Sequence, residues 1–79
     1  MAWYVYIIEC KGSLLYTGIT KNLKRRVGEH NRGDGCKFTR CRTPVKLVFN
    51  EKVASLSLAL KREAAIKRLP RQMKLKLID

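Results

Sequence analysis

Tyrosine occurs three times in this chain, and each copy lies in one of two short apolar segments. The segment WYVYIIEC at residues 3–10 holds Tyr4 and Tyr6, and the segment LYTGIT at residues 15–20 holds Tyr16. A phenol can carry a proton or position a water molecule, but its reference pKa of about 10 makes it a poor base. Nearby cations or a metal ion favour the phenolate, so strongly basic surroundings would suit a tyrosine to that role.

These two segments predict the strands of a hairpin. Residues 3–9 are rich in aromatic and β-branched side chains, residues 14–19 form the return strand, and residues with turn chemistry lie between them. A loop of three or five residues centred on Lys11 would place Tyr6 directly opposite Tyr16 on one face of the sheet. Two aromatic strand residues that simply pack together are the structural alternative.

Arg26 and His30 stand four residues apart in a helix that the pattern predicts over residues 23–32, with Asn22 as its N-cap. Residues with this spacing lie on the same face of a helix. An arginine can bind a phosphate through two parallel hydrogen bonds, and a histidine can pass a proton near neutral pH. A solvated arginine and a structural histidine are the alternatives.

Glu63 is the one carboxylate in a helix predicted over residues 56–68, and it lies within the apolar stripe of that helix. A half-buried carboxylate needs a cation or a metal ion as its partner. An ion pair with Lys67, four residues further on, is the structural alternative. One glutamate is enough to hold a Mg²⁺ ion that keeps most of its water and takes phosphate oxygens as its other ligands.

The remaining segments complete a small α+β fold. A third strand is expected over residues 45–53, and a last helix over residues 70–78 begins with Pro70 in its first turn. The order strand, strand, helix, strand, helix, helix predicts a small three-stranded, mainly antiparallel sheet flanked by helices. The 79 residues are expected to form a single domain spanning residues 1–79.

The charge of the chain predicts a polyanionic partner. Eighteen lysines and arginines oppose six acidic residues, which gives a formal net charge of +12. A domain this basic attracts nucleic acid through counterion release and long-range steering. The expected contacts to the phosphate backbone are Arg25 in the first helix and Lys37, Arg40 and Arg42 in the basic loop 31–44. Solvated loop charge is the alternative there.

Several other classes of protein are disfavoured. No apolar run approaches the roughly 18 residues of a membrane span, and the chain begins without the pattern of a secretory signal. Cys10, Cys36 and Cys41 are odd in number and contain no CxxC pair, which favours reduced thiols and a cytoplasmic location. Association with the nucleoid is left open. A zinc site built from His30, Cys36 and Cys41 would lack a fourth ligand.

The spacing of these residues resembles the GIY-YIG nuclease family, which is named for two tripeptides on the strands of a hairpin. YVY at residues 4–6 corresponds to the first tripeptide, and YTG at residues 16–18 to the second. Arg26 follows the second tripeptide by eight residues, His30 comes four residues later, and Glu63 matches an acidic residue on the later helix. LYTGIT followed by RRVGEHNRG is typical of the short stand-alone bacterial members.

The resemblance implies a metal-dependent endonuclease that hydrolyses phosphodiester bonds with one divalent ion, Mg²⁺ or Mn²⁺. It also implies a role for each of the five residues. Tyr6 activates the attacking water, and Tyr16 positions the water or the phosphate. Arg26 stabilises charge on the phosphate, His30 assists proton transfer or orients a tyrosine, and Glu63 holds the metal.

DNA is expected as the substrate more than RNA, but no residue of the sequence identifies a contact to a 2′-OH, so RNA stays open as the alternative. Contacts to the phosphate backbone carry little sequence information, so we expect weak sequence preference and recognition of strand breaks, junctions or other shapes, as in DNA repair. A protein partner that supplies specificity is a further possibility. Two alternatives dispense with catalysis: a nucleic-acid-binding module that keeps the fold, and a basic accessory protein of a ribonucleoprotein.

Overall fold

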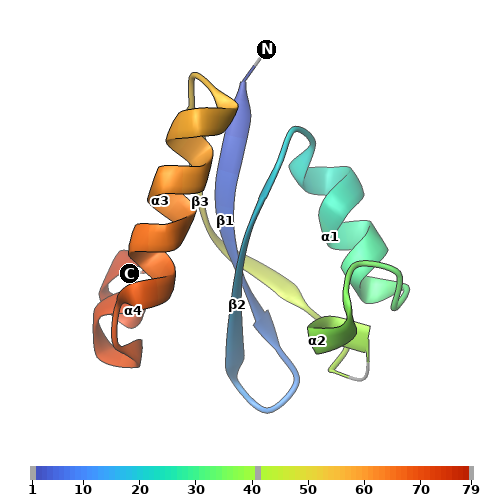
Figure 1. The fold of residues 1–79 in the computed structure, drawn as a ribbon. Coiled ribbons are helices and arrows are strands. Elements are labelled where there is room, and N and C mark those ends of the chain that lie inside the picture. The colour runs from blue at the N-terminus through green and yellow to red at the C-terminus, as the bar shows by residue number, and fades with distance from the viewer. Residues whose placement is uncertain (1, 41, 79) are drawn as a thin grey trace.

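The computed structural model describes residues 2–40 and 42–78 and shows a small sheet with helices on both faces (Figure 1). Along the chain the elements are β1 (Trp3–Cys10), β2 (Leu14–Thr20), α1 (Leu23–Asn31), α2 (Lys37–Arg40), β3 (Lys46–Val53), α3 (Leu56–Arg68) and α4 (Arg71–Ile78). The predicted α+β class and the predicted strands and longer helices are confirmed. The difference is α2, a single helical turn within the stretch that was expected to be an irregular loop.

The sheet has the order β2-β1-β3, and both strand pairs are antiparallel. The central strand β1 is buried on both faces, because its side chains alternate between two separate apolar clusters. Val5 and Ile7 pack with Ala59 and Ile66 of α3. On the opposite face, Tyr6, Ile8 and Cys10 pack against residues of β2, α1, α2 and β3.

The register of the hairpin differs from the predicted one. The loop contains three residues, as expected, but it is centred on Gly12 instead of Lys11, and Gly12 has a φ of 84°. Tyr6 therefore lies opposite Gly18, and Tyr16 lies opposite Ile8. The prediction that Tyr6 and Tyr16 face each other directly was wrong, although the offset of two residues keeps both phenols on one face.

The ends of α1 are fixed by two asparagines. The side chain of Asn22 accepts a hydrogen bond of 3.0 Å from the backbone N–H of Arg25, which confirms it as the N-cap. At the other end, the Asn31 side chain accepts from the backbone N–H of Val45 at 2.7 Å and donates to its carbonyl at 3.2 Å. This pair of bonds holds the end of α1 against the start of β3, with α2 in the loop between them.

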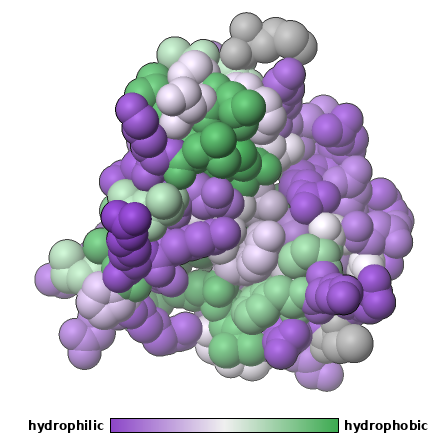
Figure 2. Space-filling model, viewed as in Figure 1, coloured by the Kyte–Doolittle hydropathy of each residue, from purple (hydrophilic) through white to green (hydrophobic). Residues whose placement is uncertain are grey.

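The buried face of α3 is narrower than its predicted apolar stripe. Ala59 and Ile66 are fully buried, whereas Leu56 and Leu60 are exposed. In the view of Figure 2, apolar side chains gather over the upper part of α3, and the surface over α1 is mostly hydrophilic. None of the helices in residues 2–40 and 42–78 is long and apolar enough to cross a membrane.

We predict that Asn31→Ala lowers the free energy of unfolding by about 1–3 kcal/mol, because the backbone groups of the buried Val45 lose their partners. Urea denaturation measures this change. Asn50→Ala at an exposed position of β3 is the control, and it should change stability by less than about 0.5 kcal/mol. Equal effects of the two substitutions would show that the Asn31 side chain does not hold α1 to β3.

Candidate active site

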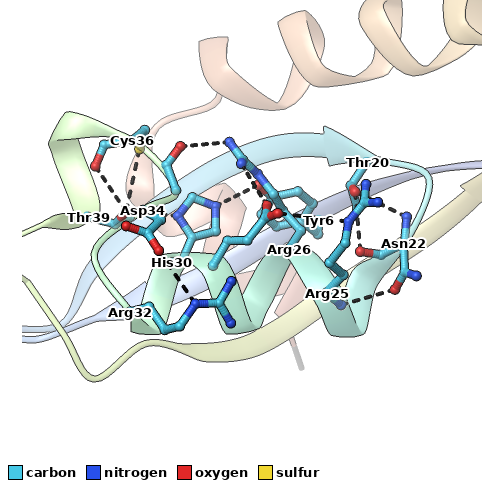
Figure 3. A network of polar contacts seen from close by, with 12 residues as sticks. Tyr6, Thr20, Asn22, Arg25, Arg26, His30, Arg32, Asp34, Cys36 and Thr39 are labelled. Atoms are coloured by element: carbon cyan, nitrogen blue, oxygen red, sulfur yellow. Dashed lines mark hydrogen bonds and ion pairs between the residues drawn. The ribbon is translucent and has the colours of Figure 1, made fainter.

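Tyr6 and His30 meet through a buried hydrogen bond on the sheet face that α1 covers (Figure 3). The Tyr6 hydroxyl lies 2.9 Å from His30 Nε2, and the two rings meet edge to face. The exposed fractions are 1% for Tyr6 and 0% for His30. The histidine is thus both a core residue and the direct partner of a phenol.

Thr39 of α2 occupies the other nitrogen of the imidazole. Its hydroxyl oxygen lies 2.8 Å from His30 Nδ1, and the same hydroxyl donates to the backbone carbonyl of Cys36 at 3.3 Å. A hydroxyl has one proton to donate, so with that proton on the carbonyl its oxygen accepts from Nδ1–H. The remaining nitrogen, Nε2, is then an acceptor, and Tyr6 donates its phenolic proton to it.

Two glycines make room for this pair of rings. A Cβ at Gly18, directly opposite Tyr6, would lie 2.6 Å from the phenolic oxygen and 2.8 Å from the ring carbon that carries it. A Cβ at Gly35 would collide with the imidazole of His30. Both positions therefore require a residue without a side chain for the Tyr6–His30 contact to form.

Arg26 is held beside the phenol and is not free in solvent. One terminal nitrogen of its guanidinium donates to Glu29 Oε1 at 3.0 Å, and the other donates to the carbonyl of Gly35 at 2.9 Å. The guanidinium also lies close enough to the Tyr6 hydroxyl to lower the pKa of that phenol. About 29% of the Arg26 side chain remains exposed, so an anion can still reach it.

Burial affects the pKa values of Tyr6 and His30 more than the neighbouring charges do. Burial raises the pKa of Tyr6, and the opposing effect of Arg26 is smaller. The expectation that cationic surroundings favour the phenolate is therefore not met by the protein alone. Burial lowers the pKa of His30, and the positive charge of Arg26 lowers it further. The pair thus rests as a neutral phenol beside a neutral imidazole, which is able to accept a proton.

Tyr16 joins the same group from β2. Its ring lies 5.3 Å from the imidazole of His30 and stacks on Phe38 at 5.6 Å. Burial raises its pKa, and the neighbouring Cys36 thiol raises it further. Although burial disfavours the Cys36 thiolate, contacts with Thr39, among them one with its backbone N–H, and with Tyr16 outweigh this effect and lower the pKa of the thiol. Tyr16 is therefore a proton donor in this arrangement.

Glu63 approaches from α3, on the other side of the sheet. Its side chain is 19% exposed and forms an ion pair with Lys67 at 3.4 Å, so the structural alternative for this residue does occur. Its negative charge contributes, as a small effect, to the raised pKa of Tyr6. The carboxylate is half-buried, and among the described residues no hydrogen bond joins it to Tyr6, Tyr16, Arg26 or His30.

The donor set fits a hard divalent ion better than zinc. No group of three or more His, Cys, Asp or Glu side chains converges within the described part of the chain. A Mg²⁺ ion that keeps its water and takes substrate oxygens needs only one carboxylate such as Glu63. Both nitrogens of His30 are engaged, which disfavours the zinc alternative, and Cys41 lies outside the described residues.

The four cations expected to bind a phosphate backbone differ in their surroundings. Arg25 has 66% of its side chain exposed and only a long contact, 3.9 Å, to Glu29. Lys37 and Arg40 are exposed on α2. The Arg42 guanidinium lies 4.6 Å above the ring of Phe38 and donates to the Phe38 carbonyl, so it is engaged in packing.

Thr39, Gly35 and Cys36 complete the site, but the sequence did not identify Thr39 or Gly35 and suggested Cys36 only as a possible zinc ligand. All three lie in the stretch between α1 and β3, whose path determines what they contact. The glycines of that stretch were the available signal, because a glycine near a candidate histidine can mark a close approach. Nothing in the sequence pattern singled out Thr39.

Comparison with known proteins identifies the family that this chain matches. The model of the GIY-YIG catalytic domain matches residues 2–76. A UPF0213 protein of Syntrophus aciditrophicus is 57% identical over 76 residues, covering 95% of this chain and 87% of that protein. A UPF0213 protein of Staphylococcus haemolyticus is 50% identical, covering 96% and 93%. The solution NMR structure of a UPF0213 protein from Bacillus halodurans is 41% identical with a TM-score of 0.63, covering 99% of this chain and 83% of that one.

We predict that Gly18→Ala lowers the free energy of unfolding by about 1–3 kcal/mol, because the added methyl group forces the Tyr6 phenol away from His30. Gly28→Ala in α1 is the matched control. Its methyl group would meet only the end of Arg32 at 3.5 Å, and alanine favours a helix by up to about 1 kcal/mol. Chemical denaturation should therefore show a lower free energy of unfolding for Gly18→Ala and a higher one for Gly28→Ala. A change of the same sign in both variants would contradict the close packing at Gly18.

We further predict that Thr39→Val changes the tautomer of His30. Without the threonine oxygen, Nδ1–H has no acceptor, so the proton should move to Nε2, where it can be donated to Tyr6. The ¹⁵N chemical shifts of the imidazole distinguish the two tautomers. Thr39→Ser keeps the hydroxyl and should retain the wild-type shifts. The same tautomer in all three proteins would show that Thr39 does not select it.

Proposed function

Because the chain belongs to the GIY-YIG family of nuclease domains, we propose that it is an endonuclease that hydrolyses phosphodiester bonds in DNA with one Mg²⁺ or Mn²⁺ ion. The observation that supports this most strongly is the buried hydrogen bond between Tyr6 and neutral His30 beside the Arg26 guanidinium. Base, proton acceptor and phosphate-binding cation then lie together, as hydrolysis of a phosphodiester requires.

Tyr6 and His30 would activate the attacking water as a relay. Since burial raises the pKa of Tyr6, the phenolate is not present beforehand. The phenol instead takes a proton from the water while it passes its own proton to Nε2 of His30, 2.9 Å away. The resulting imidazolium donates from both nitrogens, to the tyrosine oxygen and to Thr39 Oγ1, so neither proton is left without an acceptor.

Arg26 and Tyr16 would act on the phosphate. Glu29 and the Gly35 carbonyl fix the guanidinium through two of its five N–H donors, which leaves others for an oxygen of the scissile phosphate. Positive charge held in place before the reaction stabilises the negative charge that develops as water attacks. The Tyr16 hydroxyl, whose pKa is raised by burial, remains a donor that can orient the phosphate or the water.

Glu63 would hold the metal ion. When bound, a divalent ion supplies Lewis acidity that neutralises charge on the phosphate oxygens. In the structure this carboxylate is paired with Lys67 at 3.4 Å, so the metal ion would have to replace the ammonium. Lys67 is 53% exposed, so its ammonium can move into solvent and leave the carboxylate to the ion.

The substrate would be bound mainly through its backbone. Three exposed cations near the site offer contacts to phosphates: Arg25, Lys37 and Arg40. Such contacts fix the position of the protein on the nucleic acid but carry little information about its sequence. We therefore propose an enzyme of the cytoplasm with weak sequence preference, which acts on breaks or junctions in DNA repair or is directed to its target by a protein partner.

We predict that Glu63→Gln reduces cleavage at least about 100-fold and leaves DNA binding within about twofold, because the metal is lost while the basic surface stays. End-labelled duplex, single-stranded and branched DNA are incubated with Mg²⁺ or Mn²⁺, and binding is followed by fluorescence anisotropy. Glu51→Gln is the matched control, since Glu51 is also a half-exposed carboxylate in an ion pair, with Arg62 at 3.1 Å. It should cleave at the wild-type rate.

Two outcomes of this experiment would overturn the proposal in different ways. Cleavage by Glu63→Gln at the wild-type rate would remove Glu63 from the metal site. If the wild-type protein binds every substrate but cuts none of them with either ion, the domain is a binding module that keeps the nuclease fold.

A further inference from the structure

An open pocket of about 400 Å³ lies next to the site, at the junction of β2 and α1. Its wall combines an aromatic ring and an aliphatic side chain with charged groups, and the main lining residues are Trp3, Ile19, Lys21, Arg25, Arg26 and Glu29. Pockets that hold small organic molecules have volumes of about 300–1,000 Å³. This one is therefore large enough for a single nucleotide but not for a stack of base pairs.

The charge of the pocket favours an anion. Lys21, Arg25 and Arg26 contribute three positive charges against the one negative charge of Glu29. The Glu29 carboxylate is ion-paired within the protein, because it lies 3.0 Å from the Arg26 guanidinium and 3.9 Å from that of Arg25. Lys21 and Arg25 are both exposed, so their cationic groups are available to a phosphate.

The aromatic wall favours a flat ring. Trp3 is half-buried and packs against the core cluster of Val5 and Ile7, which fixes its indole in place. The ammonium of Lys21 lies over the indole, 5.1 Å from the ring centroid. A cation–π contact at an exposed site is weaker than the stacking of a nucleobase on an aromatic ring. A base can therefore take the place of the ammonium, which is then free to pair with the phosphate of the same nucleotide.

Arg26 connects this pocket to the proposed chemistry. Its guanidinium lines the pocket and also lies beside the Tyr6 hydroxyl. A nucleotide in the pocket would thus be the neighbour, on the same strand, of a phosphate bound at Tyr6 and His30. In a duplex the base is paired and stacked on its neighbours, so it can reach Trp3 only where the strand is unpaired.

We propose that this pocket binds one unpaired nucleotide next to the scissile phosphate, with its base stacked on Trp3 and its phosphate on Lys21 and Arg25. The inference rests on the proposed nuclease function and specifies its substrate class as single-stranded or locally unpaired DNA, such as flaps, gaps and frayed ends.

Trp3 is the only tryptophan of the chain, so its fluorescence reports directly on the pocket. The full chain is titrated with a short oligothymidylate, and separately with a duplex of equal length, in the absence of divalent ions so that no strand is cut. We expect saturable quenching of Trp3 by the single strand. The duplex should bind, as anisotropy of a labelled strand would show, and leave the fluorescence nearly unchanged.

Variants test the same contacts by affinity. Trp3→Leu should bind oligothymidylate about tenfold more weakly and bind the duplex with little change, since it removes a stacking surface and no charge. Lys21→Ala should weaken single-strand binding more than Lys24→Ala. Lys24 is an exposed lysine of the neighbouring helix α1 that does not line the pocket, so it controls for the loss of one charge.

The proposal would be overturned if oligothymidylate binds without quenching Trp3 and Lys21→Ala behaves like Lys24→Ala. Neither result depends on whether Trp3→Leu folds. Cleavage that requires Glu63 would then still stand, and only the substrate class would be wrong. Conversely, quenching by the single strand without cleavage of any DNA would support the pocket and refute the nuclease.

Discussion

A buried hydrogen bond between a phenol and an imidazole sets the conditions that the surrounding fold must meet. Buried polar groups need partners, and each end of the Tyr6–His30 pair has one. Thr39 occupies the far nitrogen of the imidazole, and Arg26 lies beside the phenol. Gly18 supplies the space for the phenol. Two strands and two helices are thus held in a fixed arrangement by one polar contact and its neighbours.

Those features that depend on local periodicity could be predicted from the sequence. The strands, the longer helices and the N-cap at Asn22 follow from patterns within a few residues. Tyr6 and Tyr16 were correctly placed on one face of the sheet. Moving the centre of the turn by one residue shifts the register of the two strands by two residues, which leaves every side chain on its face. Their register was wrong, since it depends on the centre of the turn. The turn was predicted to centre on Lys11, whereas it centres on Gly12, which together with Ser13 adopts a positive φ.

Contacts across the site could be predicted only where helix geometry makes them local. The pair of Glu63 and Lys67 was foreseen as an alternative because residues four apart meet on any helix. The contact of Thr39 with His30 could not be foreseen, because it depends on the path of the eight residues between them and on the single turn α2. The raised pKa of Tyr6 was likewise hidden, since charge is visible in a sequence and burial is not.

The division of the core into two clusters has a consequence for how this domain can change during evolution. Tyr6 and His30, the residues of the proposed proton relay, belong to the cluster under α1, whereas Glu63, the proposed metal ligand, belongs to a helix packed on the opposite cluster. Substitutions that repack Ile66 or Ala59 would shift the carboxylate while Tyr6 and His30 keep their bond. The position of the Glu63 carboxylate and the Tyr6–His30 contact can therefore be adjusted in separate mutational steps, while the central strand β1 packs against both clusters.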